Sequence, residues 1–152
     1  MELTTRHYLS LAALRASFGF LLVWWGLNRV LSPKQGLAIQ ERYYDGLFPS
    51  VNLQQIFGAL ELAIGLMVVF GILRWMSISV ALIICGFSGI MIFPALLDPF
   101  NLWLPFDRVS PIQHFFYPTV IAMTSGLLLL AAGDADRYSL DHLWSWWTWK
   151  RF

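Results

Sequence analysis

Charged residues are scarce in this chain of 152 residues. Only 12% are Asp, Glu, Lys or Arg, about half the share found in a typical soluble domain. A disordered chain shows the opposite balance, with high charge and few apolar residues. The ten Lys and Arg leave a net charge of +1 and are spread along the chain, which excludes the basic face of a nucleic-acid-binding protein. Because 58% of the residues are apolar, the composition indicates an integral membrane protein.

Cysteine is nearly absent as well. The single cysteine, Cys85, stands in an apolar run, so it forms no internal disulfide or CxxC redox pair, and we expect a buried structural thiol. The three histidines have no spacing with Cys or Asp/Glu that suits a metal site. No phosphate-binding glycine loop, dinucleotide motif or nucleophile elbow is present. We therefore expect no metal and no covalently bound cofactor.

Four apolar runs approach the roughly 20 residues that a membrane helix needs. The runs 75–97 and 114–132 contain no Asp, Glu, Lys or Arg, whereas 8–31 and 53–73 keep Arg15 and Glu61. Placing one charge at the centre of a membrane helix costs about 3 kcal/mol of insertion free energy. The summed favourable contributions of the apolar residues exceed this cost in either run, so both runs can still insert. The sequence therefore predicts an all-α fold, an integral membrane four-helix bundle in which residues 1–152 form a single membrane domain.

The C-terminal stretch 138–152 has a pattern of its own. A short amphipathic helix in the membrane interface is predicted, because Trp favours the headgroup region and the final basic residues suit anionic lipid. A helix that docks on a partner is the alternative. The residues that share one helical face are Leu140, Leu143, Trp144 and Trp147.

The number of spans bears on the topology. Four spans put both termini on the same side of the membrane, and the distribution of Lys and Arg favours the cytoplasmic side by one residue. The long connections 32–52 and 98–113 then share the opposite face.

The two charges inside the predicted spans share their helix faces with glycines. Small residues let helix backbones approach closely, so we expect both charges to point into a close contact between the first two spans. Because these spans run antiparallel, an extended Arg side chain can bring Arg15 to Glu61 as a buried ion pair. The glycines on these faces are Gly19 and Gly26 in the first span, and Gly58 and Gly65 in the second.

A buried pair of this kind has two interpretations. It can be a static link between helices, since desolvation offsets most of the attraction, or a functional site, since intramembrane ionisable groups mark ligand and proton pathways. A second feature is the end of the first span, where Trp25, Asn28 and Arg29, joined by His114, predict a pocket mouth at headgroup level. The alternative there is an aromatic belt with a snorkelling arginine and a solvated histidine.

Three segments resemble the DoxX/DoxD-like family of membrane proteins: "LRASFGFLLVWWGLNRVL", "FGALELAIGLMVVFGILRW" and "GLLLLAAGDADRYSLDHLW". The resemblance covers nearly the whole chain in order and spacing. It implies a four-helix bundle in a bacterial-type inner membrane with cytoplasmic termini. The residues that match the family pattern are Arg15, Gly26, Arg29, Gly58, Glu61, Gly65, Gly133, Arg137, Ser139 and Asp141.

The resemblance also carries functional expectations. The DoxD branch resembles a subunit of thiosulfate:quinone oxidoreductase, and other members are linked to membrane oxidoreductase assemblies, so quinone is the implied cofactor. Two departures stand out. The stretch "IMIFPALLDP" has no histidine where the family often has one, and a lone cysteine offers no thiol relay. Direct sulfur chemistry is therefore not expected.

These features give three hypotheses. The leading one is a membrane subunit of a quinone-linked or redox-associated complex, with no redox centre of its own and not a free-standing enzyme. The second is a non-catalytic accessory subunit that packs against a larger membrane complex through Trp-rich surfaces. The third is a small proton-coupled carrier of a weak acid or lipid, in which Glu61 cycles its proton. The expected partners are the lipid bilayer and, for the first two, other membrane-protein subunits.

Overall fold

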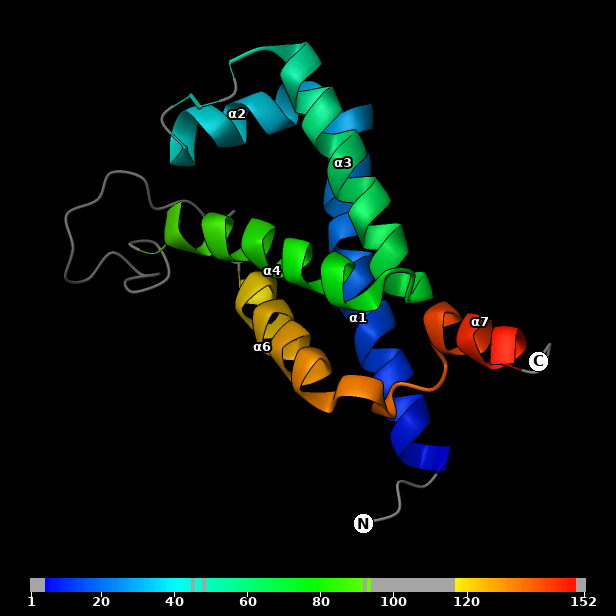
Figure 1. Ribbon diagram of the computed structural model, residues 1–152. Helices are drawn as coiled ribbons and strands as arrows, with labels where there is room; N and C mark the ends of the chain where they lie inside the picture. Colours follow the sequence, from blue (N-terminus) through cyan, green and yellow to red (C-terminus); the bar gives the residue numbers. More distant parts are fainter. Residues whose placement is uncertain (1–4, 45, 48, 92, 94–116, 150–152) are drawn as a thin grey trace.

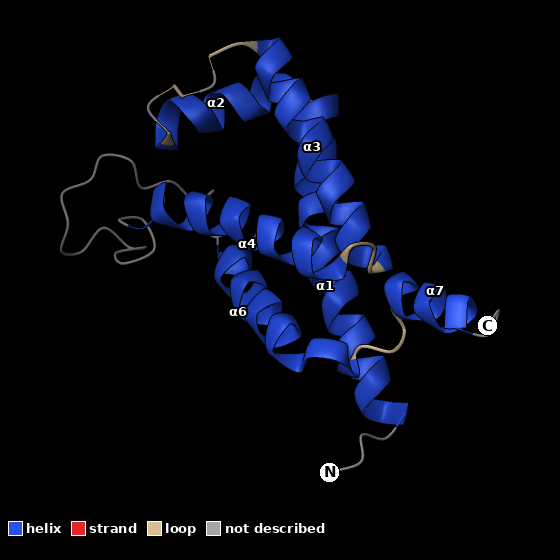
Figure 2. Ribbon diagram, viewed as in Figure 1, coloured by secondary structure: helices blue, strands red, loops and turns tan. Residues whose placement is uncertain are grey.

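The computed structural model describes residues 5–44, 46–47, 49–91, 93 and 117–149 (Figure 1). Every regular element in these ranges is a helix, as Figure 2 shows, and the all-α prediction is confirmed. The helices are α1 (Thr5–Leu31), α2 (Pro33–Tyr43), α3 (Val51–Phe70), α4 (Arg74–Met91), α6 (Tyr117–Ala132), the 3-10 turn η2 (Gly133–Ala135) and α7 (Leu140–Trp149).

Three of these helices, α1, α3 and α4, are long and apolar enough to cross a membrane. The fourth predicted span corresponds to α6, whose apolar part Val120–Ala132 is shorter. The predicted start of that span at residue 114, and the end of the third span at residue 97, lie outside the described residues. Large apolar side chains point outward from all four helices, including Phe20, Ile83 and Ile121 at 60–70% exposure. Such a surface is suited to lipid rather than to water.

Among the described helices, the most extensive contact joins α1 to α3, which run antiparallel (Figure 1). A Cβ atom on Gly26 would lie 2.5 Å from the backbone nitrogen of Leu62 and 2.6 Å from the carbonyl oxygen of Gly58. A Cβ atom on Gly19 would lie 2.7 Å from the carbonyl oxygen of Gly65. The two backbones therefore touch along the line that the four glycines form, and side chains larger than hydrogen do not fit there.

Helices α4 and α6 pack against each other and against this pair, on one side of it in Figure 1. The residues between them make up the apolar core, and Cys85 is buried in it, as expected of a structural thiol. The members of the core are Phe18, Leu22, Val68, Ile78, Ala81, Cys85, Ala122 and Leu129.

The start of α1 and the segment before α7 lie at the same end of the molecule. The rings of Tyr8 and Tyr138 meet edge to face with centroids 6.5 Å apart, and the Arg137 guanidinium lies 4.9 Å above the Tyr8 ring. The carboxylate of Asp141 also accepts hydrogen bonds from the backbone N–H groups of Leu73 and of Arg74, the first residue of α4. We call this the terminal end; it contains the beginning of α1, the α3–α4 connection and the beginning of α7.

Helix α2 lies at the opposite end, where α1 and α3 connect through residues 32–50 (Figure 1). We expected this stretch only as a connection. Its buried residues Gly36, Gln40 and Tyr44 recur every fourth position and so form one helix face. Gly36 packs against the Gln54 side chain of α3, and the Tyr44 ring contacts the Phe87 ring of α4 at 6.1 Å. Helix α2 therefore covers the ends of α3 and α4.

The predicted tail 138–152 contains α7, which covers Leu140–Trp149. Ser139 caps its start, because the backbone N–H of His142 donates to the Ser139 hydroxyl at 3.3 Å. Leu140, Leu143 and Trp144 are exposed on this helix. Residues 150–152 lie outside the described part of the chain.

Candidate functional site

Arg15 and Glu61 are both buried, at 4% and 1% exposure, but they do not pair with each other. Arg15 forms an ion pair with Asp136 and donates hydrogen bonds to the carbonyl oxygens of Val69 at 3.3 Å and Tyr138 at 3.0 Å. Glu61 pairs with Arg29, whose Nε lies 2.9 Å from the Glu61 Oε2. The predicted Arg15–Glu61 pair is therefore wrong, although both charges point inward.

The register of α1 against α3 explains the change of partners. It places Arg15 beside Val69, eight residues beyond Glu61, which is about 12 Å along the helix. Helical side chains lean toward the N-terminus of their own helix, so Arg29 reaches back along α1 toward Glu61. The prediction relied on an extended Arg15 side chain to reach Glu61, but the packed register separates the two by about two helix turns and brings Arg29 to Glu61 instead.

The Arg15 centre joins three parts of the chain at the terminal end. Its guanidinium binds α1 to the last turn of α3 and to the segment that precedes α7 through the contacts with Val69, Asp136 and Tyr138. Asp136 is fully buried. These partners are all protein groups of the fold itself, which indicates a structural role for Arg15.

Asp141 extends this joint to α4. Its carboxylate accepts hydrogen bonds from the backbone N–H groups of Leu73 at 3.0 Å and Arg74 at 2.7 Å, so it caps the start of that helix. Leu73 has a φ of 45°, a conformation that is costly for a leucine, and the bond to Asp141 helps to hold it. We name the group Arg15, Asp136 and Asp141 the C-terminal lock.

Arg29 lies at the other end of the α1–α3 contact and has a different environment. Its Nη1 donates to the Gln54 Oε1 at 2.9 Å, and its guanidinium lies 5.1 Å above the Phe57 ring. The Glu61 Oε2 lies 2.9 Å from Nε of Arg29, and no other described residue donates a hydrogen bond to it. The two charges balance each other, and a carboxylate oxygen in an ion pair can accept a further hydrogen bond.

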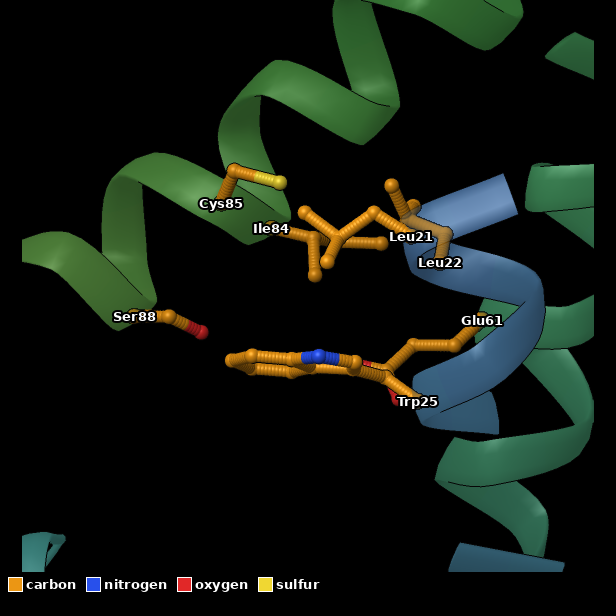
Figure 3. Close-up of a pocket in the computed structure, with 7 residues that line it drawn as sticks. All are labelled: Leu21, Leu22, Trp25, Glu61, Ile84, Cys85 and Ser88. Carbon is orange, nitrogen blue, oxygen red and sulfur yellow. The ribbon is translucent and has the colours of Figure 1, made fainter. Parts of the chain in front are cut away.

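A small cavity with apolar walls lies between α1, α3 and α4, and Glu61 is one of the residues that line it (Figure 3). Its volume is about 10 Å³, which is room for about one water molecule. Figure 3 shows the Trp25 indole extending from α1 toward Ser88 of α4. The lining residues are Leu21, Leu22, Trp25, Glu61, Ile84, Cys85 and Ser88.

Helix α2 contributes two more buried polar groups to this end. Within the described ranges, the Tyr44 hydroxyl and the Gln40 Oε1 have no hydrogen-bond partner. The Tyr44 hydroxyl lies near Ser88, Arg29 and Glu61, and burial raises the pKa of its phenol. Tyr44 therefore stays protonated, with its hydroxyl beside that of Ser88.

The structure places the predicted pocket residues unequally. Trp25 lines the cavity. Arg29 forms the ion pair with Glu61, which also lines it. Asn28 is exposed and is not among the lining residues, because it lies on another face of α1. His114 lies outside the described residues.

Sequence reasoning missed Asp136 and the site residues on α2. One signal for α2 was present, Pro33 at the first position of the helix, but no apolar stripe follows it. Asp136 carried no signal, because its partner depends on how the segment after α6 folds back to α1.

The arrangement suits binding rather than covalent or metal chemistry. The described residues hold no group of three or more His, Cys, Asp or Glu that suits a metal ion. What they provide is a buried, charge-balanced Arg29–Glu61 pair near an aromatic ring and two hydroxyls. Such a set recognises a small polar group by hydrogen bonds.

Compared with known proteins, the chain matches no family model, no curated protein and no solved structure. The resemblance to the DoxX/DoxD-like family therefore rests on the motif residues quoted from the sequence.

Proposed function

We propose that this protein is a DoxX-like membrane subunit of a quinone-linked or redox-associated complex, and that it binds a polar headgroup at the Arg29–Glu61 pair. One observation carries the proposal: Glu61 is buried within an apolar helix, paired with Arg29, and its side chain helps to line a cavity. The Asp136 carboxylate of the lock also has an oxygen without a hydrogen bond from a described residue, so the neighbouring cavity is what distinguishes Glu61. In membrane helices, ionisable groups of this kind mark ligand pathways.

The proposal includes a topology. Helix α6 crosses the membrane as a fourth span, the four helices form a bundle, and α7 lies in the interface with Leu143 and Trp144 toward lipid. The contacts of Tyr8 with Arg137 and Tyr138 support it, because they bring the beginning of the first helix and the segment after α6 to the same end. Both termini then lie in the cytoplasm of a bacterial-type cell.

The test is what the protein retains when it is purified in mild detergent. We expect bound quinone, read by absorbance and by mass spectrometry of the extracted lipids, in the wild type. Glu61→Gln keeps the shape of the side chain and removes its charge, so the quinone content is expected to fall by tenfold or more. Glu41→Gln is the matched control, because Glu41 lies exposed on α2 and its change leaves the quinone content unaltered.

Two results would count against the proposal. Equal quinone content in wild type and Glu61→Gln, with the same melting temperature, removes the site from the binding function. Proton-coupled uptake of a weak acid into liposomes by the pure protein would favour the carrier hypothesis, which uses the same Glu61 carboxyl group.

A separate observation favours the accessory-subunit hypothesis. Trp24, Trp75 and Trp144 are exposed by 55–73% on three different helices, and tryptophan is enriched at protein interfaces. Isolation of the protein only within a stoichiometric complex, unaffected by Glu61→Gln, would support this role.

A further inference from the structure

The terminal end keeps its described carboxylates inside and presents cations on its surface. The Asp136 carboxylate is buried in the ion pair with Arg15, and the Asp141 carboxylate accepts the backbone N–H groups at the start of α4. Arg6 and Arg137 are exposed, and neither forms an ion pair with a described carboxylate side chain. The described surface of this end is therefore positive.

The two exposed arginines lie at the depth of lipid headgroups in the proposed topology. Helix α1 has 27 residues and is about 40 Å long, whereas the hydrocarbon core of a bilayer is about 30 Å thick. Arg6 and Tyr8 belong to the first turn of α1, and Arg137 packs on Tyr8. The ends of α1 extend beyond the acyl chains, so these side chains face the phosphates.

The Arg137 side chain is held in a way that suits a phosphate. Its guanidinium lies 4.9 Å above the Tyr8 ring, and the Tyr138 ring supports that ring edge to face at 6.5 Å between centroids. A guanidinium held over an aromatic face has its N–H donors around a flat rim, and two of them can bind two oxygens of one phosphate. Arg137 is thus positioned before any ligand arrives, which lowers the cost of binding.

Helix α7 supplies apolar surface beside these cations. It is held at its first turn, where the Asp141 N–H donates to the Gly71 carbonyl oxygen at 3.2 Å, and beyond that turn it projects from the other helices (Figure 1). Its side chains Leu140, Leu143 and Trp144 are 45–73% exposed. A soluble anion would leave these side chains uncovered, whereas the chains of a lipid cover them.

We propose that the terminal end binds the phosphate of an anionic phospholipid, with Arg137 as the phosphate ligand, Arg6 as a second cation at the same depth, and the exposed face of α7 against the acyl chains. A zwitterionic lipid carries an ammonium group of its own, which two unpaired arginines repel, so the anionic lipid is preferred. The inference rests on the membrane topology given under the proposed function and does not depend on quinone binding. It agrees with cytoplasmic termini, because the cytoplasmic leaflet carries the anionic lipids that attract basic segments.

The experiment measures lipid binding to the full-length protein in a neutral detergent by native mass spectrometry. Phosphatidylglycerol, phosphatidylcholine and phosphatidylethanolamine are compared with the same two oleoyl chains. Phosphatidylglycerol is expected to bind about fivefold more tightly than the other two, the factor that one arginine contributes near an anionic surface. Inorganic phosphate in the same concentration range is expected not to displace it, because phosphate brings no chains for α7.

Two variants at one position separate geometry from charge. Arg137→Gln is expected to remove most of the preference for phosphatidylglycerol. Arg137→Lys keeps the charge but loses the flat pair of donors, so it is expected to keep only part of the preference. Lys34→Gln is the matched control, because Lys34 is an exposed cation on α2 at the opposite end, and this variant is expected to bind as the wild type does.

The outcomes separate this inference from the proposed redox function. Equal binding of the three lipids, or equal losses in Lys34→Gln and Arg137→Gln, overturns the inference and leaves quinone binding standing. Displacement by inorganic phosphate assigns the site to a soluble anion and also overturns it. A preference for phosphatidylglycerol in a protein that retains no quinone supports the lipid site while the redox function fails. The comparison of lipids uses the wild-type protein, so it decides the question whether or not each variant folds.

Discussion

Arg15 connects three separate parts of the chain with one side chain, through Val69, Asp136 and Tyr138. A buried charge that loses its partner costs about 3–5 kcal/mol. Arg15→Met is therefore expected to lower the free energy of unfolding by about that amount, since it leaves Asp136 buried and unpaired. The measurement is a titration with SDS in mixed micelles, followed by helical circular dichroism.

The double variant Arg15→Met with Asp136→Asn checks the cause. Part of the lost stability is expected to return, because neither charge is then left alone. Arg6→Met is the control, as Arg6 is exposed near the start of α1, and its effect is expected to stay within about 0.5 kcal/mol. A double variant less stable than Arg15→Met alone would contradict the ion-pair explanation.

Helices α1 and α3 are held together by direct contact between their backbones at the glycines. Gly26→Ala would put a Cβ atom 2.5 Å from the backbone nitrogen of Leu62, and a backbone cannot turn aside as a side chain can. The helices have to separate, and we expect a loss of about 1–3 kcal/mol, as in other overpacked interiors. The same SDS titration measures it.

Gly86→Ala is the matched control in α4. The nearest atom to its added Cβ is the flexible end of Met123 at 3.7 Å, an ordinary contact, and alanine favours a helix by up to about 1 kcal/mol over glycine. This variant is expected to be as stable as wild type or slightly more so. Equal losses in the two variants would mean that the α1–α3 glycines have no special role.

Helix α4 depends on a residue 67 positions away for its cap. Asp141→Ala removes the acceptor of the Leu73 and Arg74 N–H groups, and loss of a cap costs about 0.5–2 kcal/mol. We expect faster hydrogen exchange confined to residues 71–76, measured by mass spectrometry of peptides. Glu41→Ala, on the exposed face of α2, should leave that exchange unchanged; faster exchange throughout α4 would point to general unfolding instead.

The elements differ in how far their sequence predicts them. The long apolar runs predict α1, α3 and α4, because lipid requires each such run to satisfy its own backbone as a helix. Helix α2 escaped prediction because its buried face is made of Gly36, Gln40 and Tyr44, so no apolar stripe marks it. For that reason hydrophobicity alone could not predict that Gln40 and Tyr44 lie near the candidate site.

Partners were harder to predict than elements. The inward direction of Arg15 and Glu61 follows from their glycine neighbours, which are local in sequence. The choice of Asp136 and Arg29 as their partners depends on the α1–α3 register and on the path of the chain after α6. Both are properties of the packed molecule, and neither can be read from spacing within one helix.

At the scale of the whole molecule, the two charge centres lie at opposite ends of the α1–α3 contact. The C-terminal lock gathers the beginning of α1 and the segment before α7 at one end, while α2 covers the Arg29–Glu61 pair at the other. If the apolar helices cross a membrane, these ends face opposite sides, so the Arg29–Glu61 pair lies nearer the side away from the start of α1 and from α7.

Thiol labelling tests this topology directly. We expect a membrane-impermeant maleimide to label Lys34→Cys in intact bacterial cells, and to label Thr5→Cys and Arg137→Cys only in inverted vesicles. All three positions are exposed, and the native Cys85 is buried, so it serves as the unlabelled control. Labelling of Thr5→Cys and Arg137→Cys from opposite sides would show that α6 does not cross. That result would also contradict the contact between Tyr8 and Arg137, because two residues separated by a bilayer cannot touch.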